Sequence, residues 1–389
     1  MGKKVVKTLK LLLLLCLLLP LSGAAQVPEL VTDSEFRPDA KAAVDSIYNF
    51  QFEGADRRLS EWKEKYPQHP LWTLMEGMKF WWEILSDLQD TSHDEQFINM
   101  MKKANYQAGK LLDEQPGHVD ALIIQAISNG YIARQYSNRE EWISSLNYAR
   151  KALNANEKLK NQESGLADLK LAEGLKRYYA AYLPEAYPIV KTVSWMLPEG
   201  DKGEGLELLR EASENAIFAR AEATYFLGNI AFNYEKEYME AVQHFVELQR
   251  QYPRNNYYAR LLVKSYYRLR HYGKALEYIK TTLRHWDNEG FPKQKILQEE
   301  LWTWKGQIVE RMGNVEEALA LYKSAFELGG ELPNTRERSF WMVSGYKAGN
   351  ILAKRGEHEE ARHYLEKVAE ASRSSSYRDK ARDLLSELE

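Results

Sequence analysis

The sequence predicts an all-α protein, a right-handed superhelical solenoid of about eight helical hairpins that ends in a capping helix. Three observations lead to this fold class. Small and aromatic residues recur at helical spacings over most of the chain. Proline repeatedly follows the point where a second helix should end, because proline cannot continue the hydrogen-bond ladder. A composition of 44% hydrophobic and 28% charged residues supplies a continuous core without suggesting disorder.

Residues 1–25 have the three parts of a secretory signal peptide. Four lysines come first, an apolar run at 11–19 follows, and small residues occupy 22–25. The run is too short for a bilayer core of about 30 Å, so we expect cleavage near Ala25, with retention as an anchor as the alternative. Residues 26–38 then form an N-terminal tail. The chain has no N-glycosylation sequon. We therefore expect an extracytoplasmic protein, periplasmic or secreted, in a bacterial envelope.

Charge and cysteine content limit the chemistry of the mature chain. Cleavage removes four of the 53 basic residues and none of the 56 acidic ones, which leaves 49 against 56 and a net charge of −7. An acidic chain is poorly suited to nucleic acid, so we expect a protein or peptide partner and no nucleic acid. Membrane contact is expected only indirectly or through a retained signal sequence. The single cysteine, Cys16, lies in the cleaved segment, so no thiol or disulfide chemistry remains.

The repeats are clearest after Trp302, where Gly306 is followed by Ala318, Tyr322 and Ala325. This order resembles the tetratricopeptide repeat (TPR) family. Alanines of the second helix recur as Ala55, Ala104, Ala241, Ala275 and Ala361. A small residue precedes the alanine by twelve positions at Ala43, Val263, Gly306 and Gly349, and by thirteen at Gly228. Small residues let two antiparallel helices approach, and residues three or four apart share one face. The resemblance implies stacked hairpins over residues 39–371.

Two hairpins are longer than the pattern needs, with insertions near 87–96 and 182–200. Insertions in a solenoid project from one face and often carry binding. Tyr187, Trp195 and Met196 are the docking candidates in the second insertion. Residues 372–389 form a last amphipathic helix, which we expect to cover the open end of the stack.

Catalytic and metal motifs are not evident. His358 and His363 are five residues apart, about 140° around a helix, whereas a zinc-binding helix needs histidines four apart. We expect no metal, no cofactor and no catalytic residue. A hydrolase assembled from scattered side chains is the alternative. The neighbouring Trp81 and Trp82 point in different directions on a helix, so we expect them to pack between hairpins instead of forming a sugar-binding platform.

The TPR resemblance implies that first helices line a concave groove, and it indicates which residues would face a ligand. Amides suit a peptide backbone, Arg and Lys suit a carboxylate, and aromatic rings offer apolar walls. For the aromatic members, packing between hairpins is the alternative. The candidates, in hairpin order, are Tyr225, Asn229, Phe232; Arg260, Lys264, Tyr267; Thr303, Gln307, Glu310; and Tyr346, Asn350, Ala353.

These observations predict a non-catalytic extracytoplasmic scaffold that binds a peptide or protein segment in the concave groove. The alternative within the same class is a structural or assembly factor of the cell envelope, which would dock through the insertion at 182–200.

Overall fold

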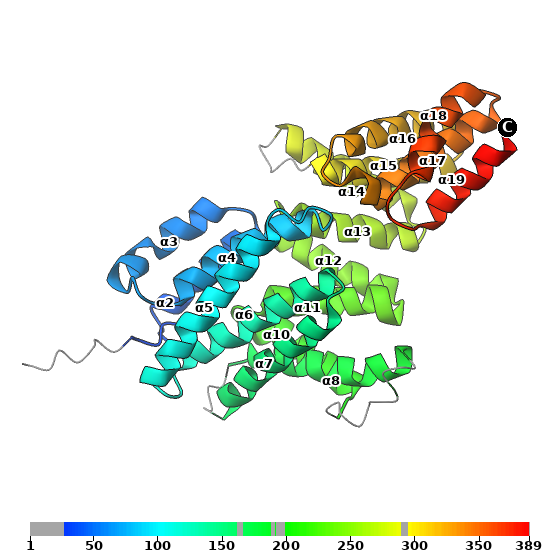
Figure 1. Ribbon diagram of the computed structural model, residues 1–389. Coiled ribbons are helices and arrows are strands. Elements are labelled where there is room, and N and C mark those ends of the chain that lie inside the picture. The colour runs from blue at the N-terminus through cyan, green and yellow to red at the C-terminus, as the bar shows by residue number, and fades with distance from the viewer. Residues whose placement is uncertain (1–26, 162–165, 188–190, 192–198, 289–294, 389) are drawn as a thin grey trace, which may run out of the picture.

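The computed structural model describes residues 27–161, 166–187, 191, 199–288 and 295–388. All regular structure in these residues is helical, and successive helices pack in antiparallel pairs (Figure 1). The predicted fold class, a solenoid of helical hairpins, is confirmed. Eight pairs can be counted within the described ranges, followed by a single last helix.

Each pair has a first and a second helix. The first helices are α2 (Phe36–Tyr48), α4 (Leu71–Ser86), α6 (Val119–Asn138), α8 (Leu169–Ala186), α11 (Arg220–Ile230), α13 (Asn256–Arg268), α15 (Lys295–Arg311) and α17 (Ser339–Lys354). The second helices are α3 (Phe52–Lys65), α5 (Asp94–Glu114), α7 (Trp142–Lys160), α10 (Lys202–Asn215), α12 (Tyr238–Gln251), α14 (Tyr272–Asn288), α16 (Val315–Gly330) and α18 (His358–Ala369). The last helix is α19 (Ser376–Glu387).

Six hairpins share one turn between their two helices. In each, one residue has a positive φ, the next precedes the second helix, and the third begins it. The positive-φ residues are Phe50, Glu140, Lys236, Arg270, Gly313 and Gly356. Only the last two are glycine, the residue that adopts this left-handed conformation at no steric cost. Except in the turn at Lys236, the following amide donates to a carbonyl five residues back, which closes the first helix.

The small residues of the first helices are needed for close packing. A Cβ added at Gly306 would lie 2.7 Å from the Tyr322 ring, and one at Gly228 would lie 2.6 Å from Phe245. Both distances are shorter than real contacts, so the second helix would have to move away. The alternation of small and aromatic residues in the sequence is therefore the packing rule of the hairpin.

The irregular spacing after Gly228 has a structural cause. α11 continues into a single π-helical turn, η2 (Ala231–Glu235), which accommodates one extra residue. The amide of Glu237 accordingly donates to a carbonyl six residues back, that of Ala231. Gly228 thus stays opposite the second helix although Ala241 follows it by thirteen residues instead of twelve.

The last helix covers the end of the stack as predicted. α19 packs against α17 and α18, with Ala381 fully buried and the Tyr377 ring centroid 5.7 Å from that of Tyr346. Among the described helices, none combines the length and the apolar character needed to cross a membrane. The apolar run 11–19 lies outside the described residues.

The two predicted insertions differ in what the structure describes. α4 and α5 are long helices, so the loop between them shortens to residues 87–93. In the second insertion, α8 extends to Ala186 with Pro184 inside it, and Tyr187 follows with 51% of its surface exposed. Trp195 and Met196 lie outside the described residues, so their docking role stays a prediction.

Candidate binding surface

The first-helix face, the side of the solenoid formed by the first helices, is covered by the chain itself around α11. Glu222 on α11 accepts hydrogen bonds from the hydroxyls of Tyr48 on α2 (3.0 Å) and Tyr131 on α6 (2.9 Å). Its other carboxylate oxygen is 3.1 Å from the Arg134 guanidinium. Burial and the Glu222 charge raise the pKa of both tyrosines, which keeps them as neutral donors. The first and third hairpins are therefore tied to the fifth.

Arg134 also lies against three aromatic rings. Its guanidinium carbon is 4.7 Å from the ring centroid of Trp81, 4.8 Å from that of Tyr225 and 5.3 Å from that of Phe226. A guanidinium stacks well on such faces because it is planar and weakly hydrated. Together with the Glu222 ion pair, these contacts close the face here.

Further contacts join the first hairpin to the loop before α13. The Tyr252 hydroxyl donates to Asp45 at 2.7 Å, and the Asn255 amide donates to the Tyr48 carbonyl at 2.7 Å. These partners are 207 residues apart in sequence. The N-terminal hairpins consequently occupy the face that a groove ligand would need at α11 and the start of α13.

Two of the predicted groove aromatics are buried. Tyr225 is 8% exposed, with its hydroxyl 3.1 Å from that of Tyr257, and Phe232 is 6% exposed beneath Lys264. These two side chains pack within the protein, which was the alternative to forming apolar walls for a ligand. Asn229 is half-buried, and its side-chain oxygen accepts from Asn233 at 2.6 Å.

Arg260 and Lys264, the predicted carboxylate-binding residues, are also engaged within the chain. Arg260 donates to the Leu85 carbonyl at the end of α4 (3.2 Å) and is 3.4 Å from Glu300. The Lys264 ammonium is 4.7 Å from the Phe232 ring, and burial lowers its pKa. The predicted exposure of Arg260 is therefore not observed, because 16% of its side chain is accessible.

The face remains accessible farther along the chain, on α13, α15 and α17. The Tyr267 hydroxyl donates to Gln307 at 3.2 Å and accepts from the exposed Arg311 at 3.0 Å. Tyr346 and Asn350 on α17 are half-buried. We call Tyr267, Gln307, Arg311, Tyr346 and Asn350 the open row. Whether the row binds a ligand stays a prediction.

The remaining groove candidates on these helices are used internally. Thr303 is fully buried and donates to the Glu299 carbonyl at 2.9 Å. Glu310 accepts from the Tyr322 hydroxyl at 2.7 Å and pairs with Lys347 at 3.0 Å. Ala353 is a half-buried apolar residue that packs with the C-terminal core. They shape the wall beside the open row without presenting free polar groups to it.

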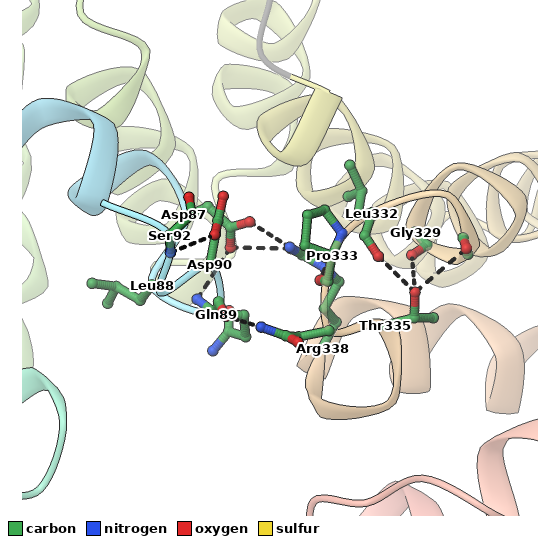
Figure 2. Close-up of polar contacts among 12 residues, drawn as sticks. Asp87, Leu88, Gln89, Asp90, Ser92, Gly329, Leu332, Pro333, Thr335 and Arg338 are labelled. Atoms are coloured by element: carbon green, nitrogen blue, oxygen red, sulfur yellow. Dashed lines mark hydrogen bonds and ion pairs between the residues drawn. The ribbon is translucent and has the colours of Figure 1, made fainter. Parts of the chain in front are cut away.

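The loop at 87–93, predicted as a projecting insertion, is held from two sides. Figure 2 shows Arg338, from the segment before α17, reaching Asp87 in this loop. The two side chains are 3% and 5% exposed, and one of their contacts measures 3.1 Å. On the other side, Arg139 donates to the Leu88 carbonyl and pairs with Asp94. The loop therefore joins the second hairpin to the eighth.

A second buried carboxylate lies next to this contact. Glu299 on α15 is 1% exposed, and burial raises its pKa to about 8. This value already includes the Arg338 charge, which lowers the pKa, and the Glu300 and Asp87 charges, which raise it. Within the described part of the chain, Oε1 of Glu299 has no hydrogen-bond partner. The raised pKa favours the protonated, neutral form of Glu299 at neutral pH.

Trp81 and Trp82 pack inside the protein, as predicted. Both are essentially unexposed, and their ring contacts include Phe97 and Tyr131 for Trp81, and Tyr48 and Tyr258 for Trp82. In the described ranges, no group of three or more histidine, cysteine, aspartate or glutamate side chains is placed to hold a metal ion.

The Glu222 centre was missed by the sequence reasoning. Glu222 lies three residues before Tyr225, on the same face of α11, where it would be expected to meet solvent or a ligand. A signal does exist in the sequence, since a lone carboxylate stands among apolar neighbours in the segment Ala221–Leu227. That signal indicates burial with partners but does not identify them.

One comparison with protein families agrees with the observed helical hairpins. A family model described as tetratricopeptide repeat matches residues 260–331, from within α13 to the end of α16. Among solved structures, "Human IFIT1 dimer with m7Gppp-AAAA" is similar at 14% identity and a TM-score of 0.48, covering 92% of this chain and 87% of that one. "Crystal Structure of the Yeast Tom70" matches at 14% identity and a TM-score of 0.29, covering 92% and 89%. A comparison with curated proteins finds no significant match.

Proposed function

We propose that this protein is a non-catalytic extracytoplasmic scaffold that binds a protein or peptide segment on the open row. The observation that carries the proposal is the contrast within the first-helix face. The part at α11 is closed by a shielded ion pair, whereas the open row remains at least partly accessible on three successive first helices, α13, α15 and α17.

The chemistry of the open row suits an extended polypeptide. Gln307 and Asn350 carry amides that can both donate to and accept from a peptide backbone. Arg311 is exposed, and among the described residues it makes no ion pair with a carboxylate, so it is available to an acidic side chain or a terminal carboxylate. Tyr267 and Tyr346 supply apolar surface with a polar tip. A polypeptide fits this mixture better than nucleic acid does, because the proposed mature chain is acidic overall.

Extracytoplasmic location rests on the N-terminal sequence pattern, and it is tested separately. N-terminal sequencing of the protein from the native host should find a chain that begins at Gln26. A full-length chain in the cytosol would contradict the localisation without affecting the binding proposal.

The binding surface is tested by crosslinking in the native host, followed by capture with a variant of the open row. The variant combines Tyr267→Ala, Arg311→Glu and Asn350→Ala, and we expect it to lose the captured partner. The matched control carries the same types of change on α14, namely Glu277→Ala, Lys280→Ala and Arg284→Glu, and should capture normally. Equal capture by both variants, with unchanged circular dichroism, would refute the assignment.

A further inference from the structure

A cavity of about 480 Å³ lies between two second helices of the last two hairpins, α16 and α18. Each helix lines it with residues three and four apart, which share one helix face. An ion pair of 2.6 Å between Lys323 and Glu360 joins the two helices one turn before the cavity, and Figure 1 shows them as neighbours. Small-molecule sites have volumes of about 300–1,000 Å³, so the cavity has the size of such a site.

Three aromatic side chains form the floor of the cavity. The Phe326 ring on α16 stacks on that of Trp341 on α17, with centroids 4.8 Å apart. It also packs edge to face with the Tyr364 ring on α18, at 5.2 Å. All three residues are buried and yet line the cavity. A ligand in the cavity therefore meets aromatic surface with its apolar part.

Two opposite charges line this cavity without pairing. Glu327 comes from α16 and Lys367 from α18, and both are exposed. Within the described ranges neither makes an ion pair, and the Lys367 ammonium lies instead 3.3 Å from Nε2 of His363. The other two charged residues of the lining, Arg336 and Glu370, pair with each other at 3.4 Å. One carboxylate and one ammonium group are therefore available to a ligand, one on each wall.

The α16 wall also contains a glycine that the fold does not require. Gly330, the last residue of α16, has no positive φ, and a Cβ added there would have no neighbour within 4 Å. The adjacent Gly329 differs, because its added Cβ would lie 2.5 Å from the Glu299 carboxylate. Figure 2 shows that Thr335 closes this helix end, with its hydroxyl 2.7 Å from the Leu332 carbonyl. Gly330 thus leaves open space where a larger side chain would narrow the cavity.

We propose that this cavity binds a small zwitterion with a large apolar side chain, that is, a free apolar α-amino acid. Its carboxylate pairs with Lys367, its ammonium group pairs with Glu327, and its side chain lies on the aromatic floor. A ligand with a single charge would leave one of the two walls without a partner. The site is independent of the open row, because it lies between second helices whereas the open row lies on first helices.

The test is isothermal titration calorimetry of the protein with three probes. Phenylalanine carries both charges, N-acetylphenylalanine lacks the ammonium group, and phenylalaninamide lacks the carboxylate. We expect phenylalanine to bind with a Kd below about 1 mM, and each of the other two probes to bind about tenfold more weakly. No binding of phenylalanine at about 10 mM, or equal binding of the three probes, would overturn the proposal.

Two charge variants assign the walls of the cavity. Lys367→Met should bind phenylalanine about tenfold more weakly and should no longer distinguish it from phenylalaninamide. Glu327→Gln should no longer distinguish phenylalanine from N-acetylphenylalanine, because the partner of the ammonium group is gone. Both residues are exposed, so neither change should affect folding. Unchanged discrimination by both variants would contradict the proposed pairing.

A third variant fills the cavity. Gly330→Leu places a side chain in the open space beside the floor and should abolish binding of all three probes. The matched control is Gly273→Leu on α14, an exposed helical glycine whose added Cβ also has no neighbour within 4 Å. It should bind phenylalanine as the wild type does. Circular dichroism shows whether both variants are folded, and a folded Gly330→Leu protein that binds as well as the control would refute this site.

Discussion

Two parts of the first-helix face differ in how far they are covered by the rest of the chain. At α11, Glu222 and Arg134 are shielded, hydrogen-bonded and stacked against aromatic rings that come from several hairpins. At α13 to α17, Tyr267 and Gln307 make pairwise contacts between neighbouring first helices and keep part of their surface free. The position of a residue within its hairpin therefore decides which face of the solenoid it occupies. Whether that face is open depends on whether hairpins distant in sequence pack onto it.

The two parts should also differ in energy. A buried ion pair that loses one partner leaves an uncompensated charge in a medium of low dielectric constant. A neutral hydrogen bond near solvent can be replaced by one to water. The closed part should accordingly dominate stability, and the open row should tolerate change.

The largest effect is expected from Glu222→Ala. This change leaves Arg134 without its counter-ion and leaves the hydroxyls of Tyr48 and Tyr131 without an acceptor. We expect a loss of about 3–5 kcal/mol in the free energy of unfolding, measured by urea denaturation.

The control for this prediction is Glu277→Ala on α14. Glu277 also forms an ion pair, with Lys274, but both side chains are largely exposed. A loss below about 0.5 kcal/mol is expected there. Similar losses at the two sites would show that the shielded Glu222 contributes no more to stability than an exposed ion pair does.

The free energy of unfolding should depend on pH because of Glu299, which lies on α15 next to the contact between Arg338 and Asp87. Burial raises its folded-state pKa from the ordinary 4.5 to about 8. Between these values the folded protein holds a proton that the unfolded chain has released, so the free energy of unfolding falls as pH rises. The slope is about 1.4 kcal/mol per pH unit well below pH 8 and flattens as the folded protein titrates, so the fall from pH 6 to pH 8 is about 2 kcal/mol.

The variant Glu299→Gln mimics the protonated acid and should lack this contribution. In urea unfolding at pH 6, 7 and 8, the free energy of unfolding of the variant should therefore rise relative to that of the wild type as pH rises. Parallel curves for the two proteins would show that Glu299 ionises in the folded state as readily as in the unfolded chain.

The smallest expected effect is a difference in stability loss between two variants that each remove one tyrosine hydroxyl. Tyr131→Phe removes a hydrogen bond to the Glu222 carboxylate and should cost about 1.5–3 kcal/mol, because the acceptor is charged. Tyr267→Phe removes the hydrogen bonds with Gln307 and Arg311, but water can replace both near the surface, so it should cost about 0.5–1.5 kcal/mol. Thermal unfolding of both variants measures the difference, and the reverse order would contradict the comparison.

The hairpins could be predicted because their determinants are local. Gly306 and Tyr322 contact each other across one turn, and their spacing is visible in the sequence. The placement of α19 over the end follows from the same logic, since the last hairpin leaves an apolar face uncovered. The thirteen-residue spacing after Gly228 was noted in the sequence, but its cause, a π-helical turn, required backbone geometry.

The closure of the face could not be predicted. The contact between Arg338 and Asp87 joins residues 251 positions apart, and that between Tyr48 and Glu222 joins residues 174 apart. Whether such residues meet depends on small rotations accumulated over several hairpins, which no single spacing encodes. Arg260 was therefore assigned to the correct helix, but its partners, Leu85 and Glu300, were not foreseen.

The π-helical turn of η2 has a genetic consequence. One extra codon in an ordinary first helix would rotate every following side chain by about 100° and carry the next packing residues off their face. Here the extra residue is absorbed within Ala231–Glu235, and Ala241 still meets its partner helix. A repeat array of this kind can thus lengthen by one amino acid at a time without a compensating change in the neighbouring repeats.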